Sequence, residues 1–342
     1  MLKIGIHIGI VILLFSCKKE VGPQSLIEAK KGTGSIIIVN EGNFGFGNAS
    51  VSIYNPQSKE VFNNQFKEIN GFGIGDVLQS VNRHQDSYYF VVNNSGKIVI
   101  TDTNLVYLSE INGFASPRYI EFVGNKGFVT DLKQGGVYVV DLITNRISNF
   151  IKTHGWTETI CIANNKVYVL DRGDYLANSQ LNYIFVLDPE NEQTIDSIPT
   201  AKNPNSMVID DNNELWVLTS GDNGTEKPKL LQIDLLSKLK TKEFIFPEYL
   251  DNPRRMVYTD NRLFFINRNL YVMNVVDSLL PAIPFYAKTR SNFYGLSFDA
   301  ILKNFYLCDA KNYNQQGEVI RIDINGNVID KILSGIIPQS IQ

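Results

Sequence analysis

Four prolines in this sequence open short strand-like segments, and the residue after each of them is polar. These residues are Arg118, Asn205, Arg254 and Gln339. If these positions only packed a core, we would expect apolar side chains there. Guanidinium and amide groups instead bind polar ligands through directed hydrogen bonds, so the recurrence predicts a binding surface to which several segments contribute.

Aromatic and amide side chains occur in further loops of the same recurring pattern. The candidates are Phe72, Trp156 and Tyr294, beside the openings of apolar segments, and Asn43, Phe44, Phe46, Tyr175 and Tyr313, after second segments. Flat aromatic faces combined with amide and guanidinium donors suit a large polar small molecule with apolar surfaces, such as a corrinoid or a glycan. The alternative, in which the aromatics cap packed strands and the polar groups meet water, stays open.

Recognisable catalytic motifs are absent from the sequence. After the first 17 residues the only histidines are His84 and His154, and neither HExxH nor GxSxG occurs. A histidine zinc site and a serine-hydrolase elbow are therefore not predicted, and no cofactor is expected. Asp76, Asp131 and Glu158 are the carboxylates that a hydrolytic enzyme would draw on, which keeps an enzyme as an alternative.

Two acidic segments could hold calcium in a loop. Residues 171–174 read DRGD and residues 210–214 read DDNNE, and neither has the spacing of an EF-hand. The second has the composition of a hairpin turn. The first leaves a bound calcium ion as an open alternative.

The overall charge argues against nucleic acid as a partner. The chain has 32 Lys and Arg against 35 Asp and Glu, a formal net charge of −3, and no basic stripe. The three cysteines do not suggest a disulfide framework. Cys161 and Cys308 lie inside apolar strand-like runs, where we expect buried free thiols.

The beginning of the chain resembles the signal of a bacterial lipoprotein. Its apolar run is too short to span a bilayer and fits a secretory signal. The run ends in a lipobox-like Leu-Phe-Ser-Cys, so we expect residues 1–16 to be a signal peptide and Cys17 to be acylated; an ordinary cleaved signal is the alternative. Residues 17–35 would form a flexible tether, and Lys18, in place of an aspartate, favours the outer membrane.

A unit of about 40 to 50 residues repeats along the rest of the chain. Each copy has an apolar segment, a turn, a second apolar segment, a loop, a third segment that ends near an aspartate, and a more polar fourth segment. The copies are 76–111, 117–151, 158–198, 204–246, 253–286 and 293–333. Four short strands at this spacing are typical of one blade of a β-propeller.

The turns inside the copies favour tight hairpins. They read GNK, NNK, DDNNE and TDNR, and Asn and Asp tolerate the left-handed backbone that such turns need. The apolar runs have the length of strands, and no segment shows a sustained helical stripe. We therefore predict an all-β protein with almost no helix.

The two ends of the repeat region should complete one blade. Residues 36–66 supply only three strands, whereas residues 337–341 read IPQSI and look like the openings of the other copies. The final strand should therefore become the innermost strand of the first blade, which closes the ring and removes exposed sheet edges. This predicts a seven-bladed propeller of four-stranded blades over residues 36–342. Six or eight blades remain alternatives because the copy at 253–286 is irregular.

The repeats resemble those of the YVTN/YncE-like propeller family. A more particular segment, Asn40-Glu41-Gly42-Asn43-Phe44-Gly45 followed by Asn-Ala-Ser-Val-Ser, is similar to the opening blade of certain propeller lipoproteins. Those lipoproteins come from Gram-negative bacteria and accompany TonB-dependent outer-membrane transporters, and one branch captures cobalamin at the cell surface. The resemblance implies an outer-membrane ligand-binding lipoprotein, and its specific motif is confined to the first blade.

Three functional hypotheses result. The first is a cell-surface lipoprotein that captures a corrinoid-like or glycan-like nutrient for a TonB-dependent transporter and touches the membrane only through its lipid. The second is a propeller hydrolase or lactonase-like enzyme that uses the carboxylates named above. The third is a structural or adhesive surface protein, which exposed apolar patches would favour. The anchor, the closed ring and the loop chemistry favour the first, and the periplasmic face of the outer membrane stays an alternative location.

Overall fold

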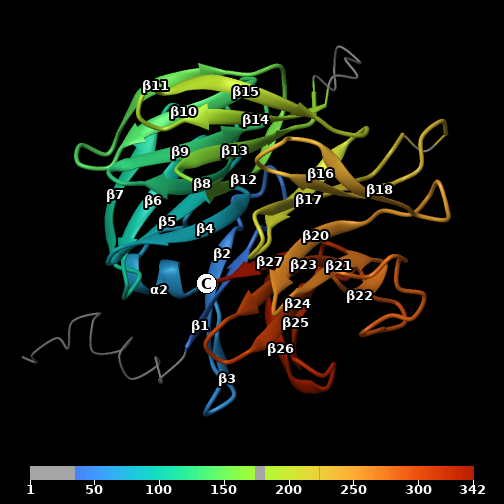
Figure 1. Ribbon diagram of the computed structural model, residues 1–342. Helices are drawn as coiled ribbons and strands as arrows, with labels where there is room; N and C mark the ends of the chain where they lie inside the picture. Colours follow the sequence, from blue (N-terminus) through green and yellow to red (C-terminus); the bar gives the residue numbers. More distant parts are fainter. Residues whose placement is uncertain (1–34, 174–181, 223) are drawn as a thin grey trace, which may run out of the picture.

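A computed structural model describes residues 35–173, 182–222 and 224–342. The predicted signal peptide, Cys17, the tether up to residue 34 and Tyr175 lie outside these ranges. Within them the strands form seven antiparallel sheets, six with four strands and one with three. The sheets stand as blades around one axis (Figure 1), because each innermost strand contacts the innermost strands of the blades on both sides. The predicted seven-bladed propeller is confirmed.

Each blade runs from the axis outward in chain order, except the first. The innermost strands are β27 (Pro338–Ile341), β4 (Leu78–His84), β8 (Pro117–Val123), β12 (Thr157–Ala163), β16 (Pro204–Ile209), β20 (Arg254–Thr259) and β23 (Phe293–Asp299). The second strands are β1 (Ile36–Asn40), β5 (Ser87–Val92), β9 (Lys126–Asp131), β13 (Lys166–Asp171), β17 (Glu214–Thr219), β21 (Arg262–Asn267) and β24 (Asn304–Asp309).

The outer half of each blade completes the sheets. The third strands are β2 (Ser50–Asn55), β6 (Lys97–Asp102), β10 (Gly136–Asp141), β14 (Tyr183–Asp188), β18 (Lys229–Asp234), β22 (Asn269–Asn274) and β25 (Gln316–Asp323). The outermost strands are β3 (Glu60–Phe62), β7 (Tyr107–Asn112), β11 (Arg146–Lys152), β15 (Gln193–Pro199), β19 (Lys240–Ile245) and β26 (Val328–Ile336).

The last strand closes the ring by joining the first blade. β27 pairs antiparallel with β1, with Ile341 opposite Ile38 and Ser340 opposite Val39. The backbone of Ile37 exchanges two hydrogen bonds of 2.9 Å with Gln342. Figure 1 shows the red end of the chain beside the blue beginning of the propeller. The prediction that residues 337–341 complete the first blade is confirmed, and no inner sheet edge is left open there.

Apolar side chains between neighbouring blades form the core. In one cluster, Phe128 and Val139 of the third blade pack against Val167 and Val169 of the fourth, and all four are fully buried. The second strands are almost continuously buried because a neighbouring blade covers each of their faces. Burying one such Val or Phe side chain contributes about 1.5–3 kcal/mol, so the inter-blade clusters hold the ring together.

Asparagine and aspartate form the hairpin turns as predicted. Asn164 and Asn165 have φ of 49° and 54°, and Asp260 and Asn261 have φ of 49° and 56°. Two successive residues with positive φ are the signature of a two-residue turn that matches strand twist. The turn chemistry that the repeats share therefore sets the first hairpin of these blades.

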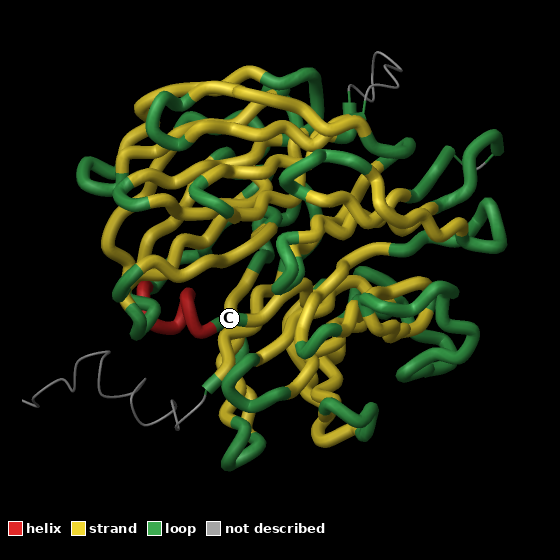
Figure 2. The backbone as a smooth tube through the Cα atoms, in the orientation of Figure 1, coloured by secondary structure: helices red, strands yellow, loops and turns green. Residues whose placement is uncertain are grey.

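The sixth blade departs from the four-strand pattern. β20, β21 and β22 form a three-stranded sheet, and only an isolated bridge between Leu270 and Tyr286 stands where a fourth strand would pair. This blade corresponds to the irregular copy at 253–286, which had left six or eight blades as alternatives, and the blade count is seven. The described residues contain a single helix, α2 (Gln65–Asn70), drawn in red in Figure 2. No helix in the described ranges is long and apolar enough to cross a membrane.

The cysteines that the structure describes are free thiols. Cys308 is buried and Cys161 is partly exposed. Burial raises the pKa of both thiols to about 12. Both side chains therefore pack as small apolar groups rather than as nucleophiles.

Candidate functional site

Each innermost strand places one polar or aromatic side chain at the end of the axis where these strands begin, which we call the upper end. These seven ring residues are Gln79, Arg118, Glu158, Asn205, Arg254, Tyr294 and Gln339. Six of them are the second residue of their strand, and Arg254 is the first of its strand. Arg118, Asn205 and Gln339 are second in their strands because a proline is the first strand residue. A proline has no N–H to donate, and at the first strand position this costs no hydrogen bond of the sheet.

Irregular pairing turns the ring residues toward the axis. In all seven blades, the pairing between the innermost strand and the second strand shifts register near the upper end of the innermost strand. Such bulges re-aim side chains that would otherwise alternate between the two faces of a strand. In β20 the shift lies between Arg254 and Val257, and Arg255 adopts a φ of 52°, which is uncommon for a non-glycine residue.

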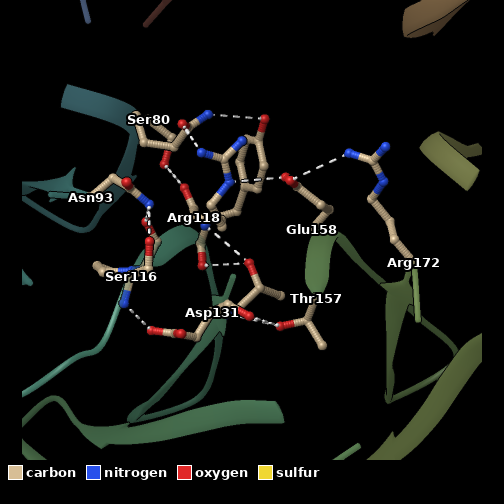
Figure 3. Close-up of polar contacts among 12 residues, drawn as sticks. Ser80, Asn93, Ser116, Arg118, Asp131, Thr157, Glu158 and Arg172 are labelled. Carbon is tan, nitrogen blue, oxygen red and sulfur yellow. Dashed lines mark hydrogen bonds and ion pairs between the residues drawn. The ribbon is translucent and has the colours of Figure 1, made fainter. Parts of the chain in front are cut away.

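Arg118 and Glu158 form the central ion pair of the ring. Arg118 Nε lies 3.0 Å from Glu158 Oε2, and Arg118 Nη1 donates to Gln79 Oε1. Figure 3 shows Glu158 between the guanidinium groups of Arg118 and Arg172, the latter 4.0 Å from Glu158 Oε1. Burial acts to lower the pKa of Arg118, but the Glu158 carboxylate and Tyr119 together outweigh it and the pKa is raised. Arg118 therefore stays protonated.

A hydrogen-bond network beneath Arg118 fixes the start of its strand. Ser80 Oγ donates to the Arg118 carbonyl oxygen at 2.7 Å, and Asn93 Nδ2 donates to Ser116 Oγ at 3.0 Å (Figure 3). The buried Asp131 carboxylate accepts from the Ser116 backbone N–H at 2.7 Å. These bonds connect the second and third blades, so they position the ring from below.

Arg254 and Arg255 are consecutive arginines, and both reach toward β23 of the next blade. Arg254 Nη2 donates to the Phe293 carbonyl oxygen at 2.7 Å, and Arg255 Nε donates to the Tyr294 carbonyl oxygen at 3.1 Å. Arg255 Nη1 also donates to Tyr119 Oη at 2.5 Å. Among the described residues, no carboxylate oxygen lies within 4.0 Å of either guanidinium. Burial lowers the pKa of Arg254, as expected for a cation without an acidic partner.

Glu41 is the second carboxyl group near the axis. Burial raises its pKa, against a hydrogen bond from Tyr294 and the charges of Arg118 and Arg255, which act to lower it. Burial also raises the pKa of Tyr294, so this phenol stays protonated and donates. Glu41 thus interacts with the ring without forming an ion pair within 4.0 Å among the described residues.

Several buried polar atoms of this cluster have no hydrogen-bond partner within the described protein. They are both side-chain polar atoms of Gln339, Arg254 Nε, Arg172 Nε, Asn205 Oδ1 and Glu41 Oε2. Buried polar groups are nearly always satisfied in native proteins, and leaving one unsatisfied costs about 1–3 kcal/mol. Their concentration at one end of the axis indicates that something outside the protein chain, water or a ligand, completes the bonding.

The structure brings some of the predicted loop residues to the ring and leaves others apart. Tyr313 contacts Tyr294, with ring centres 5.9 Å apart, and Asn43 Nδ2 donates to the Tyr313 carbonyl oxygen at 2.6 Å. Trp156 is partly buried at the start of the fourth blade, and its backbone pairs with Gly173 and Arg172.

Three predicted aromatics do not pack onto the ring. Phe44 and Phe46 are 71% and 77% exposed on the loop before β2. Phe72 packs edge-on against Phe66 of α2 and Tyr107 of the outermost strand β7. Phe72 therefore serves the outer side of the second blade, where α2 covers it.

Sequence reasoning missed three members of the cluster. Gln79 follows Leu78, so selecting the residues that follow a proline did not find it. Its position in the repeat, second in the first strand of its copy, would have identified it. Glu41 lies inside the first-blade motif, and Tyr119 directly follows Arg118. Only the bulges bring Tyr119 to the same side as its neighbour, and strand alternation gave no signal for that.

The carboxylates considered for catalysis have separate structural roles. Asp76 accepts from the backbone N–H groups of Gly45 and Gly47, at 2.8 and 3.3 Å, and so ties down the first-blade loop. Asp131 accepts from the Ser116 backbone N–H, and Glu158 pairs with Arg118.

Within the described residues no group of three His, Cys, Asp or Glu side chains is arranged to hold a metal ion. The open question of calcium at 171–174 falls partly outside the described residues, and Asp171 itself accepts backbone N–H groups of His154 and Gly155.

Comparison with known proteins supports the fold. A family model described as a domain of unknown function (DUF5074) matches residues 34–267. No curated protein matches the chain. A quinonprotein alcohol dehydrogenase-like protein from Bacteroides thetaiotaomicron has a TM-score of 0.65 and 16% identity, covering 89% of this chain and 77% of that one.

Two further solved structures are similar. A functionally unknown protein from Desulfotomaculum acetoxidans has a TM-score of 0.67 and 11% identity, covering 90% of this chain and 98% of that one. Kuenenia stuttgartiensis hydrazine synthase has a TM-score of 0.63 and 16% identity, covering 75% and 85%. At these identities the likeness is one of fold alone.

Proposed function

This chain belongs to the family described as a domain of unknown function (DUF5074), and from that premise we propose that its propeller captures a small polar molecule at the upper end of the axis. The observation that carries the proposal is the ring itself. Seven blades each contribute one side chain, and several of its buried polar atoms lack partners in the protein. A rigid scaffold that converges unsatisfied donors and acceptors on one place is suited to binding.

The rim of the ring adds aromatic surface to these polar groups. Tyr294 and Tyr313 lie edge to face beside Arg254, and Phe44 and Phe46 are exposed on the neighbouring loop. Aromatic faces bind the apolar faces of a ligand while guanidinium and amide groups fix its orientation. We therefore propose a large ligand of mixed polarity, corrinoid-like or glycan-like, rather than a small ion alone.

The setting of the proposal comes from the sequence. The lipobox-like segment before Cys17 supports an outer-membrane lipoprotein, and the resemblance of the first-blade motif supports a place beside a TonB-dependent transporter. In this setting the protein would bind a nutrient at the cell surface and pass it to the transporter. We propose binding rather than catalysis because Asp76, Asp131 and Glu158 are each committed to fixed partners.

A ligand screen tests the proposal. The full chain carrying Cys17→Ala, which removes the predicted acylation site, would be screened by thermal shift and calorimetry against corrinoids, haem and glycans. We expect a saturable hit at one site per chain, with loss of binding in Tyr294→Ala and Asn205→Ala. Silence against all three classes, or a hit that neither substitution weakens, would contradict capture at the ring.

A further inference from the structure

We propose that Arg254, Arg255 and Gln339 form a site for an anionic oxygen group, a carboxylate or a phosphate, at the upper end of the axis. This inference rests on the proposed function, because it names the chemical class that the captured ligand must carry. It concerns one arc of the ring, formed by the successive innermost strands β20, β23 and β27.

Neither arginine has an ion-pair partner within 4.0 Å among the described residues. Burial acts to lower the pKa of Arg255, but Tyr119, Tyr294 and the more distant Glu158 carboxylate together raise it, whereas the pKa of Arg254 is lowered. Both arginines are partly buried, and their hydrogen-bond partners are two carbonyl oxygens and one phenol. Other arginines of the cluster do have an acid, since Glu158 lies 3.0 Å from Arg118 and 4.0 Å from Arg172. Burying a cation without a counter-charge is costly, so a bound anion would remove a penalty that the protein otherwise carries.

The nearby acids do not fill this role. Glu158 is already shared between Arg118 and Arg172. Glu41 is hydrogen-bonded to Tyr294, and burial raises its pKa, which favours its neutral form. The cluster therefore has four arginines against two glutamates, and neither glutamate forms an ion pair within 4.0 Å with Arg254 or Arg255.

Gln339 supplies an independent indication of a ligand. Its side chain is 3% exposed, and neither its amide nitrogen nor its amide oxygen has a hydrogen-bond partner in the described protein. The backbones of β23 and β27 approach so closely at this point that a Cβ at Gly295 would overlap the Gln339 carbonyl oxygen. Gln339 is thus held in place beside β23 with an unused donor, as in a pre-organised ligand contact.

The bulge in β20 allows both arginines to act on one group. In a regular strand, consecutive side chains point to opposite faces. The left-handed φ of 52° at Arg255 breaks this alternation, and Arg254 and Arg255 then donate to the consecutive carbonyl oxygens of Phe293 and Tyr294. Arg254 Nε has no partner in the described protein. A guanidinium with a free N–H edge binds oxyanions through parallel hydrogen bonds.

Two simple anions test the site without knowledge of the complete ligand. Inorganic phosphate and propionate would be titrated by calorimetry, at constant ionic strength, into the full chain carrying Cys17→Ala. We expect saturable binding of at least one anion, with one site per chain and affinity at least tenfold weaker in Arg254→Gln and in Gln339→Leu. The variants would be checked for folding by circular dichroism, and Gln339→Leu removes no charge and thus provides a second readout if Arg254→Gln does not fold.

Arg83→Gln is the matched control. Arg83 is an exposed arginine at the opposite end of an innermost strand, β4, so its loss should leave anion affinity unchanged within twofold. Binding of phosphate alone or of propionate alone would assign the class of anion. Absence of saturable binding for both anions, or equal affinity in parent, Arg254→Gln and Gln339→Leu, would overturn the inference.

The results also separate this inference from the capture proposal. A corrinoid or glycan that binds Arg254→Gln as tightly as the parent would overturn the anion site and leave capture intact. Anion binding that Arg254→Gln abolishes, together with silence in the ligand screen, would support the anion site and contradict corrinoid-like or glycan-like capture.

Discussion

Arg118 and Glu158 lie on the innermost strands of adjacent blades, and the 3.0 Å contact between Arg118 Nε and Glu158 Oε2 ties β8 to β12 at the axis. The side chains are 18% and 9% exposed, so the pair is far less hydrated than a surface ion pair. It therefore links two blades at the axis. The same guanidinium also donates to Gln79 of a third blade.

Replacing Glu158 should destabilise the fold more than replacing a surface acid. Glu158→Gln leaves Arg118 charged without its counter-ion, and we expect a loss of about 2–3 kcal/mol in the free energy of unfolding, measured by urea denaturation. Glu110→Gln is the matched control, since its 2.8 Å pair with Lys97 is more exposed, and its loss should cost about 0–1 kcal/mol. Equal effects of the two substitutions would contradict the role assigned to the axial pair.

Closure of the ring should be sensitive to one glycine. A methyl group at Gly295 would overlap the Gln339 carbonyl oxygen, so Gly295→Ala must separate β23 from β27. We expect a loss of at least about 2 kcal/mol in unfolding free energy. Gly73→Ala is the control, because nothing lies within 4 Å of its added carbon, and it should stay within about 0.5 kcal/mol of the parent. A neutral Gly295→Ala would show that the two strands are not packed as described.

A half-buried carboxyl group on the innermost strand β8 should make stability depend on pH. Burial raises the pKa of Glu121 to about 7, against a hydrogen bond from Asn82 that acts to lower it. The folded state therefore keeps this proton to higher pH than the unfolded chain, and stability falls as pH rises from about 4.5 to about 7. Glu121→Gln removes this effect.

The difference between Glu121→Gln and the parent measures the effect directly. Urea unfolding at pH 4.5 and at pH 8 should show that the variant gains up to about 3 kcal/mol relative to the parent at the higher pH. Other titrating groups are common to both proteins and cancel in the difference. Parallel stability curves for the two proteins would refute the raised pKa of Glu121.

The lipid anchor makes a prediction about one cysteine. In a Gram-negative host, Cys17→Ala should abolish labelling by radioactive palmitate and release the protein from the membrane fraction. Cys161→Ala is the control, because this thiol lies inside the propeller and should leave labelling unchanged. Retained acyl label in Cys17→Ala would exclude Cys17 as the acylation site.

Most of the fold could be predicted because short sequence patterns that recur in every copy determine it. The Asn and Asp turns, the four short strands of each copy and the IPQSI closing segment each depend on a few neighbouring residues. The loss of the fourth strand in the sixth blade was visible only as an irregular copy, because Tyr286 is placed by tertiary contact with Leu270.

The site was less predictable, since long-range contacts decide it. The preceding prolines selected Arg118, Asn205, Arg254 and Gln339, and all four lie at the starts of innermost strands. Loop position alone put Phe72 among the candidates, whereas this side chain packs against Phe66 of α2. The contacts of Arg254 and Arg255 with β23 occur at a backbone bulge that has no sequence signature of its own.

The pairing of β1 with β27 also governs the order of events during synthesis. β1 is among the first propeller strands to be made, yet its inner neighbour is completed about 300 residues later, roughly 15–60 seconds at ordinary elongation rates. Until then the first blade exposes an unpaired edge that can pair with other chains. A nascent chain in this state requires protection from aggregation, and premature termination before residue 338 leaves that edge permanently open.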